Sequence, residues 1–232
     1  MTKRMALCVG LTKLDPAAYD GWEGDCPGCD LDAYRMAKKC HSVGFDGVSV
    51  LLNEAATAEN IRDNFLHASA RLSSGDLLLL FSSGHGGQDY DVNGDEEDCC
   101  DETLCWWDGQ VNDDTIGSFL FGLPTGLRVV YITDTCNSGT NFRNLSHRHK
   151  KLESPEGILF LHIGGCEDGR SSYGDERGGY LTLKLMDALS DARKPLSYQE
   201  WFDRTLLRMD AEVQKPAIYT LGESFLDQQA LA

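Results

Sequence analysis

The segment from Asp76 to Gly87, which reads DLLLLFSSGHGG, decides the fold. Its first half, Asp76–Phe81, is apolar after the aspartate, which is typical of a strand covered on both faces. Such strands occur in parallel sheets with helices packed on each side. Its second half places a histidine among glycines just beyond the strand. Ligands of α/β proteins bind at that end of a parallel sheet, so function is expected there.

The same alternation of strands and helices extends in both directions from this segment. Five more short apolar runs predict strands at 6–11 (ALCVGL), 48–52 (VSVLL), 128–133 (RVVYIT), 157–163 (GILFLHI) and 217–221 (AIYTL). Helical spacing predicts helices at 31–43, from the N-cap Thr57 to about Leu72, and at 113–123, 181–192 and 197–213. No strand or helix is predicted for the acidic stretch 88–102, and 140–155 is expected to be a loop. Together these elements predict an α/β fold with a mainly parallel sheet.

Composition and charge limit the classes of function. The 232 residues are 41% hydrophobic and carry a net charge of −16, which excludes a disordered chain and argues against a nucleic-acid partner. No apolar run approaches the ~18 residues of a membrane span, and the N-terminus lacks the apolar core of a signal peptide. A cytoplasmic protein without membrane contact is therefore expected. The nine cysteines are expected to be mostly reduced thiols.

A cysteine follows the strand at 128–133, in the sequence Asp134-Thr135-Cys136-Asn137-Ser138-Gly139. If the two strands are neighbours, His85 and Cys136 meet at one edge of the sheet. An imidazole can take the proton of a thiol and later return one to a leaving amine. The flanking glycines leave backbone N–H groups free to hold an oxyanion. A lone cysteine or histidine at such a place is more often structural, so the pair carries the prediction.

These motifs resemble those of the metacaspases and orthocaspases, the caspase-like cysteine peptidases of clan CD. Further matches are Gly28–Ala33 (GCDLDA), Gly165–Asp168 (GCED), Gly179–Thr182 (GYLT) and Gln214–Pro216 (QKP). The resemblance implies a caspase-like α/β/α sandwich of about six mostly parallel strands, with the last strand antiparallel at the edge. It also implies one domain over 1–232, divided into a large-subunit-like part (1–142), a linker (143–156) and a small-subunit-like part (157–232).

The resemblance also implies catalytic roles. Cys136 would be the nucleophile of an endopeptidase and His85 its general base and acid, with the backbone N–H groups of Gly86 and Cys136 as the oxyanion hole. The S1 pocket would be acidic and accept Arg or Lys, and its residues would be Asp32, Ser83 and Asp134. A buried guanidinium needs such paired carboxylates. The structural alternatives are a first-turn helix acid for Asp32 and a strand-end turn residue for Asp134.

One position departs from the family pattern. Asn137 follows the cysteine where the family commonly has a histidine. We expect this change to leave the chemistry intact.

The acidic stretch raises the question of calcium. It begins like an EF-hand loop at Asp89, but position twelve is Cys100 rather than Glu, so an EF-hand is rejected. Many metacaspases require calcium, and the resemblance implies Asp101 and the pair Asp113-Asp114 as ligands. A further acidic ligand is replaced near Arg143. The alternative is a solvated acidic loop.

The remaining cysteines offer a different class of function. Cys26 and Cys29 have CxxC spacing, and Cys99, Cys100 and Cys105 follow, so a zinc module or a catalytically silent scaffold is the main rival. A thioredoxin-like redox pair is another, although such a pair should follow the first strand more closely and directly open a helix, whereas fourteen residues separate Leu11 from Cys26. Cys8, Cys40 and Cys166 are expected in the core.

Substrates and partners follow from the proposed pocket. Proteins or peptides with a basic P1 residue are the expected substrates. Basic residues in the linker lie where related enzymes cut themselves, at Arg143, Arg148, Lys150 and Lys151; a plain exposed loop is the alternative. A monomer is expected, with any regulatory partner a separate protein.

Overall fold

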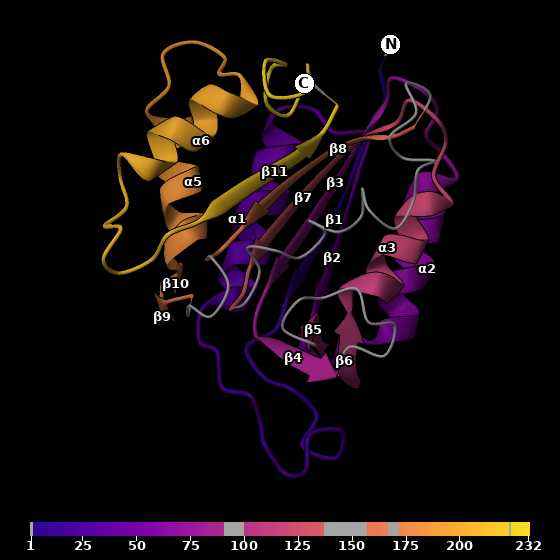
Figure 1. The fold of residues 1–232 in the computed structure, drawn as a ribbon, viewed down its shortest axis with the longest axis vertical. Coiled ribbons are helices and arrows are strands. Elements are labelled where there is room, and N and C mark those ends of the chain that lie inside the picture. Colours follow the sequence, from indigo (N-terminus) through magenta and orange to yellow (C-terminus); the bar gives the residue numbers. More distant parts are fainter. Residues whose placement is uncertain (1, 91–99, 137–156, 167–171, 223) are drawn as a thin grey trace.

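A six-stranded sheet forms the centre of the computed structural model, which describes residues 2–90, 100–136, 157–166, 172–222 and 224–232 (Figure 1). The strand order is β11-β8-β7-β3-β1-β2. The strands are β1 (Arg4–Gly10), β2 (Gly47–Leu52), β3 (Leu77–Ser83), β7 (Arg128–Asp134), β8 (Leu159–Gly164) and β11 (Ala217–Leu221). Only β11, at one edge, runs antiparallel to its neighbour. The expected sheet is confirmed.

Helices cover both faces of this sheet (Figure 1). One face packs against α2 (Ala58–Ser69) and α3 (Asp113–Phe121), and the other against α1 (Cys29–Ser42), α5 (Tyr180–Ser190) and α6 (Tyr198–Leu206). Successive residues of β3 alternate between the two cores: Leu78 and Leu80 face α2 and α3, whereas Leu79 and Phe81 face the other three helices. This two-sided burial explains why β3 is apolar at successive positions.

Local signals place most helix starts correctly. The Thr57 hydroxyl accepts from the Asn60 N–H and caps α2, as predicted. Ser197 and Glu200 form a capping box at the start of α6. The predicted helix end at residue 213 is wrong, because α6 stops at Leu206. The N–H of Asp210 donates to the Tyr180 hydroxyl instead of a helical carbonyl, as the chain turns back toward β11.

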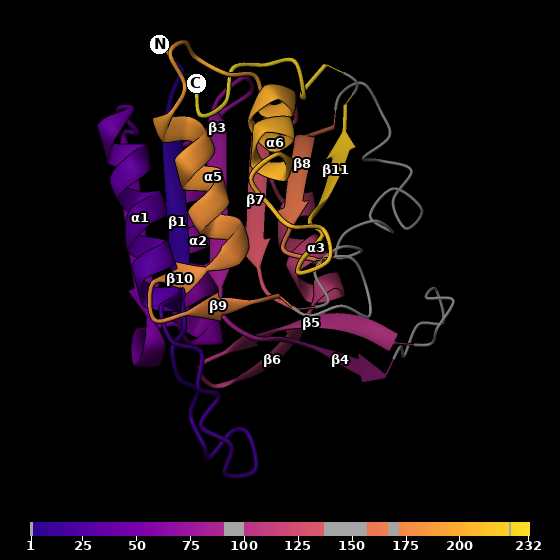
Figure 2. The same ribbon diagram turned by 90° about the vertical axis from the view of Figure 1, so that its left-hand side faces the viewer.

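A second, antiparallel sheet lies beyond the carboxyl ends of the parallel strands (Figure 2). It consists of β4 (Gly86–Tyr90), β5 (Cys100–Trp106) and β6 (Gly109–Asn112). No strand is predicted in 88–102. This is wrong at both ends of the stretch, which belong to β4 and β5, and Asp89 of β4 pairs with Asp101 of β5. The polar residues of β5 interrupt the alternation of apolar and polar residues by which a strand is identified in a sequence. A short hairpin of β9 (Gly174–Asp175) and β10 (Gly178–Gly179) is also not predicted.

Two findings complete the fold. In the part of the chain that the structure describes, no helix is long and apolar enough to cross a membrane. The predicted linker 143–156, with its candidate cleavage residues, lies outside the described residues.

Candidate active site

The register of two neighbouring strands brings the predicted dyad to one place. β3 and β7 are parallel neighbours, and Ser83 pairs with Asp134. His85 and Cys136 each lie two residues beyond this pair, so both leave the sheet at the same edge. They line a cleft of about 240 Å³. The other lining residues come from the loop before α1, the end of β3 and β7, and the β9–β10 region: Asp25, Cys26, Pro27, Cys29, Ser83, Gly84, Asp134, Ser172, Tyr173, Gly174 and Gly179.

Cys136 is half-buried, and its sulfur receives a hydrogen bond. The backbone N–H of Ser172 donates to Sγ at 3.3 Å. The thiol in turn donates to the Ser172 carbonyl oxygen at 3.9 Å, so both contacts fix the position of the sulfur in the cleft. Gly86 must be a glycine in this arrangement, because a Cβ there would overlap the carbonyl oxygen of Cys136. The first residue of β4 therefore passes directly against the backbone of the candidate nucleophile.

His85 is held by its backbone and by its ring. The backbone carbonyl of His85 accepts from the N–H of Cys105 at 3.0 Å. Its Nε2 lies 3.3 Å from the carbonyl oxygen of Asp25, and its ring centroid lies 4.8 Å from that of Trp22. A carbonyl only accepts, so Nε2 is the protonated nitrogen in this contact and Nδ1 is left to act as a base.

Two buried carboxylates lie behind the cleft. Asp134 accepts from the Ser172 hydroxyl at 2.7 Å and from both the N–H and the hydroxyl of Thr182 at 2.8 Å. Asp32 accepts from the Ser83 hydroxyl at 3.0 Å and the Gly179 N–H at 2.7 Å. Burial raises the pKa of both carboxyls, that of Asp32 to about 7. The neighbouring charge of Asp134 adds to the rise at Asp32.

The three predicted S1 residues are joined, but they are not equally accessible. Ser83 and Asp134 line the cleft. Asp32 is 0% exposed and lies behind Ser83, and its Oδ1 is 3.1 Å from Nη1 of Arg35. A cationic side chain entering from the cleft would therefore meet Ser83 and Asp134 first.

Three residues that sequence reasoning left without a role hold this site together. Gln214 is buried, donates to the Gly165 carbonyl at 2.7 Å and the Ser172 hydroxyl at 3.0 Å, and accepts from the Tyr173 N–H. Thr182, in the first turn of α5, binds Asp134. Thr182 and Gln214 belong to the matched motifs GYLT and QKP, so the sequence did mark these two positions. The spacing of a motif does not predict which groups a buried amide contacts. No motif included Ser172.

The predicted metal ligands lie on adjoining elements. Asp101 on β5 is 2% exposed and Asp113 at the start of α3 is 5% exposed. Asp101 accepts from the side-chain amide of Asn112, the N-cap of α3. The backbone of Asp114 is in the first turn of α3. Within the described ranges, no group of three or more His, Cys, Asp or Glu side chains is placed to hold a metal ion.

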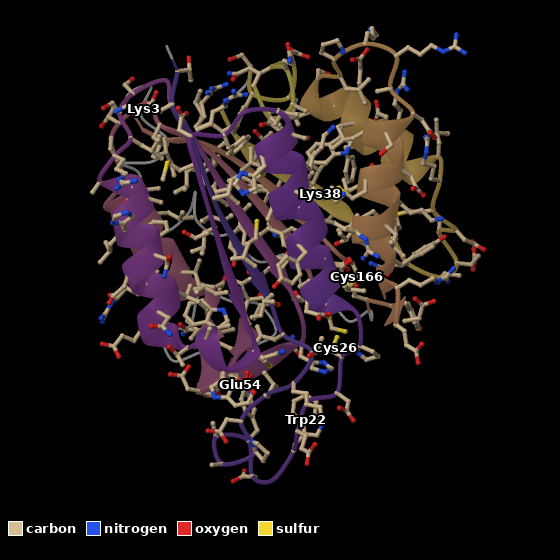
Figure 3. All side chains as sticks on the ribbon, turned by 180° about the vertical axis from the view of Figure 1, so that it is seen from behind. Lys3, Trp22, Cys26, Lys38, Glu54 and Cys166 are labelled. Carbon is tan, nitrogen blue, oxygen red and sulfur yellow. The ribbon has the colours of Figure 1, made fainter. Side chains whose placement is uncertain are left out.

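The CxxC motif borders the same cleft. Cys26 and Cys29 both line it, and Figure 3 shows Cys26 near the end of α1 with Trp22 on the loop below. Cys29 is the first residue of α1, so the motif opens this helix, although it lies well beyond the end of β1 at Gly10. Cys99 lies outside the described residues.

A second cysteine and histidine lie on or next to β8, but they are sealed in the core. His162 is 1% exposed and is hydrogen-bonded to Thr133, and Cys166 is 0% exposed. Burial lowers the pKa of His162 to about 3. Neither residue is among those that line the cleft, in contrast to His85 and Cys136.

Comparison with known proteins agrees with this geometry. Residues 3–225 match the model of the caspase domain, Peptidase_C14. The chain is 33% identical over 152 residues to Metacaspase-1 of Cryptococcus neoformans, and this match covers 60% of this chain and 32% of that protein. It is 35% identical over 214 residues to Metacaspase-3 of Arabidopsis thaliana, covering 78% of this chain and 59% of that one. The chain thus spans about a third of the length of the fungal relatives it matches.

Solved structures share the fold. Protein GSU0716 from Geobacter sulfurreducens superimposes with a TM-score of 0.84 at 29% identity, over 99% of this chain and 98% of that one. Caspase-1 from Spodoptera frugiperda gives a TM-score of 0.67 at 16% identity, over 95% and 87%. The expected caspase-like sandwich is confirmed by these likenesses.

Proposed function

Because this chain belongs to the caspase-domain family Peptidase_C14, we propose that it is a cysteine endopeptidase with Cys136 as nucleophile and His85 as general base. The observation that carries the proposal is the meeting of these two residues in one cleft, beyond adjacent strand ends. The N–H that Ser172 donates to the Cys136 sulfur supports it, since this contact holds the sulfur in place at the cleft.

The proposed reaction has two stages. Cys136 Sγ attacks the scissile carbonyl carbon as its proton passes to His85, and the N–H groups of Gly86 and Cys136 hold the oxyanion. His85 then gives the proton to the leaving amine, which departs and leaves a thioester on Cys136. Water, deprotonated by His85, hydrolyses the thioester and restores the thiol. Asp25 and Trp22, which contact the His85 ring, would hold it in position during both stages.

We infer a preference for Arg or Lys at P1 from the charge behind the cleft. Asp134 reaches the cleft and Asp32 lies one hydrogen bond further back, through Ser83. A guanidinium placed against Asp134 gains a charge-assisted hydrogen bond in a site with little water. The negative charge of these two carboxylates would repel an aspartate side chain at P1. Arg35 already neutralises part of Asp32, so Asp134 carries more of the recognition.

We also propose that calcium binds at the second sheet. Asp101 and Asp113 are oxygen donors of the kind that this ion prefers, and both are buried on adjoining elements. Asp114, whose side chain is not described, is the third candidate. These ligands would tie β5 to α3, and β5 pairs with β4, which begins at Gly86. Calcium would thereby fix the strand that supplies one oxyanion N–H group.

Hydrolysis of fluorogenic peptides ending in Arg, Lys or Asp tests this proposal. The three peptides share their other residues and are assayed with calcium and with a chelator, beside Cys136→Ala and Cys166→Ala. The proposal predicts cleavage after Arg and Lys that Cys136→Ala abolishes and Cys166→Ala retains. Removal of calcium is expected to reduce the rate. Cleavage after Asp would contradict the pocket, and no cleavage by the wild type would favour the catalytically silent scaffold.

A further inference from the structure

The sequence Cys26-Pro27-Gly28-Cys29 forms a tight turn that holds two thiols together. Gly28 has φ 87° and ψ −6°, the values for the third residue of a type II turn, and proline is favoured at the second. The Cys29 N–H lies 3.5 Å from the Cys26 carbonyl oxygen and closes the turn. Such a turn brings its first and last Cα atoms within about 7 Å, which overlaps the range that a disulfide spans.

The two sulfur atoms are already in contact. Cys26 Sγ lies 2.9 Å from Cys29 Sγ, and neither residue is assigned a role in the proposed hydrolysis. The pair is asymmetric: Cys26 is partly exposed to the cleft, whereas Cys29 is 3% exposed. The hydrogen bond from the Cys29 thiol lowers the pKa of Cys26, against the opposing effects of burial and of the carboxylates Asp134 and Asp32. The accessible thiol is thus the one that ionises more readily.

Metal binding explains this pair less well than redox chemistry. Two thiolates alone do not make a structural zinc site, which takes four ligands. In the part of the chain that is described, no third metal-binding side chain joins them. Cys105, which the sequence offered as a further ligand, is buried and hydrogen-bonded to Tyr19.

We propose that Cys26 and Cys29 are a reversible dithiol switch that closes to a disulfide on the wall of the candidate active site. The oxidant is a small disulfide of the glutathione class. The Cys26 thiolate attacks one sulfur of oxidised glutathione and releases one glutathione thiolate. The Cys29 thiolate then attacks Cys26 Sγ in the mixed disulfide and releases the second. The protein loses two electrons and two protons, and two molecules of glutathione are formed.

The switch touches the proposed catalytic machinery at two points. The residue before it, Asp25, supplies the carbonyl oxygen that contacts His85 Nε2. On the other side, Gly28 packs so tightly against the β9–β10 hairpin that a Cβ would lie 2.5 Å from the Gly178 nitrogen. That hairpin continues into Gly179, whose N–H binds Asp32. Closure of the disulfide draws the two sulfurs together, so it shifts the turn between His85 and the carboxylates.

Redox titration followed by thiol mapping tests the bond itself. The full chain carrying Cys136→Ala is equilibrated in reduced and oxidised glutathione, alkylated, digested and examined by mass spectrometry. The proposal predicts that the peptide containing Cys26 and Cys29 becomes lighter by two hydrogens, takes up no alkylating agent, and reverts with dithiothreitol. Recovery of both thiols in every mixture, or a reaction that stops with glutathione on Cys26, would overturn it.

The chain supplies matched controls. Cys8 and Cys40 are both 0% exposed, and burial raises the pKa of each thiol, so this buried pair should stay reduced throughout the titration. Cys26→Ser and Cys29→Ser must each abolish the internal disulfide. Oxidation of Cys8 and Cys40 together with the CxxC pair would mean that the chain had unfolded and would contradict a specific switch.

The coupling to the active site rests on the proposed peptidase activity and is measured separately. For the wild type and for Cys26→Ser, the rate of peptide cleavage after oxidation is divided by the rate before oxidation, and the two ratios are compared. The proposal predicts a reversible loss in the wild type that is several-fold greater than in Cys26→Ser. An equal loss in both would come from Cys136 and would contradict the coupling, while the thiol map would still report the disulfide.

Discussion

At the scale of single residues, the site is dominated by two carboxylates that the fold keeps away from water. Asp32 is 0% exposed and Asp134 is 4% exposed. Each is stabilised by hydrogen bonds from other elements, Asp134 by Ser172 and Thr182, and Asp32 by Ser83 and Gly179. The ionised form is nevertheless disfavoured by burial, which raises both pKa values. Asp32 therefore binds a proton at a pH where most carboxyls are ionised.

Asp32 makes the stability of the protein depend on pH. Its pKa is about 7 in the folded chain, above the value of about 3.9 in an unfolded chain, so the folded state binds the extra proton between these values. The contribution of this group to the free energy of unfolding is therefore largest below pH 4, and it decreases as the pH rises toward 7. Urea unfolding of wild type and Asp32→Asn at several pH values measures the effect. The wild type should lose about 3 kcal/mol relative to the variant between pH 4.5 and 7.5.

An exposed acid serves as the control for this series. Asp63→Asn, on the surface of α2, should show no such change relative to the wild type. A difference between wild type and Asp32→Asn that is constant with pH would mean that Asp32 is ionised throughout. In that case the pocket would present its full charge at all of these pH values.

At the scale of elements, the start of α5 closes the back of the cleft. Gly179 is the N-cap of α5 and has no capping side chain of its own. The side chain of Asp134, from β7, takes that role by accepting from the N–H of Thr182. A Cβ at Gly179 would overlap the Asp134 carboxylate, although the φ of −69° at this position would suit any residue. The glycine is therefore required by the close approach of helix and strand.

Gly179→Ala should separate α5 from Asp134. The added methyl group forces the helix start or the carboxylate to move, which is expected to cost about 1–3 kcal/mol of stability. It should also reduce cleavage after Arg at least tenfold, because the carboxylate is displaced from the cleft. Thermal unfolding and peptide hydrolysis measure the two effects.

Gly122→Ala is the matched control, since Gly122 has φ −76° and its nearest neighbour would lie 3.6 Å from an added Cβ. It should leave both properties unchanged or raise the stability by up to about 1 kcal/mol. Equal behaviour of the two variants would refute the required contact between α5 and Asp134.

Regular elements were predictable where periodicity and capping residues agreed. The runs at 77–81 and 128–133 and the cap Thr57 each led to a correct strand or helix. The second sheet was not predictable, because Asp101, Glu102 and Thr103 on β5 are polar yet buried. A strand that buries charged side chains lacks the alternation on which sequence reasoning depends.

At the scale of the whole molecule, the sheet topology brings together motifs that lie far apart in the sequence. His85 and Cys136 were identifiable as a pair because strand ends are close in an α/β sheet, and the register of β3 and β7 brings them together. The placement of Asp32 behind Ser83, and the roles of Ser172 and Gln214, were not predictable. They depend on contacts of Ser172 with Cys136 and of Gln214 with Gly165, at sequence separations that no local pattern records.

The identity of the reacting cysteine tests the central proposal most directly. A peptidyl chloromethyl ketone ending in arginine is incubated with the wild type and with His85→Ala, and the modified residue is located by peptide mass spectrometry. The chain offers several other thiols, among them Cys26, Cys29 and Cys166, so the outcome is discriminating. The proposed dyad predicts alkylation of Cys136 alone in the wild type, and a large decrease in its rate in His85→Ala. Labelling of Cys26, Cys29 or Cys166 in place of Cys136, or labelling of Cys136 at the same rate without His85, would contradict it.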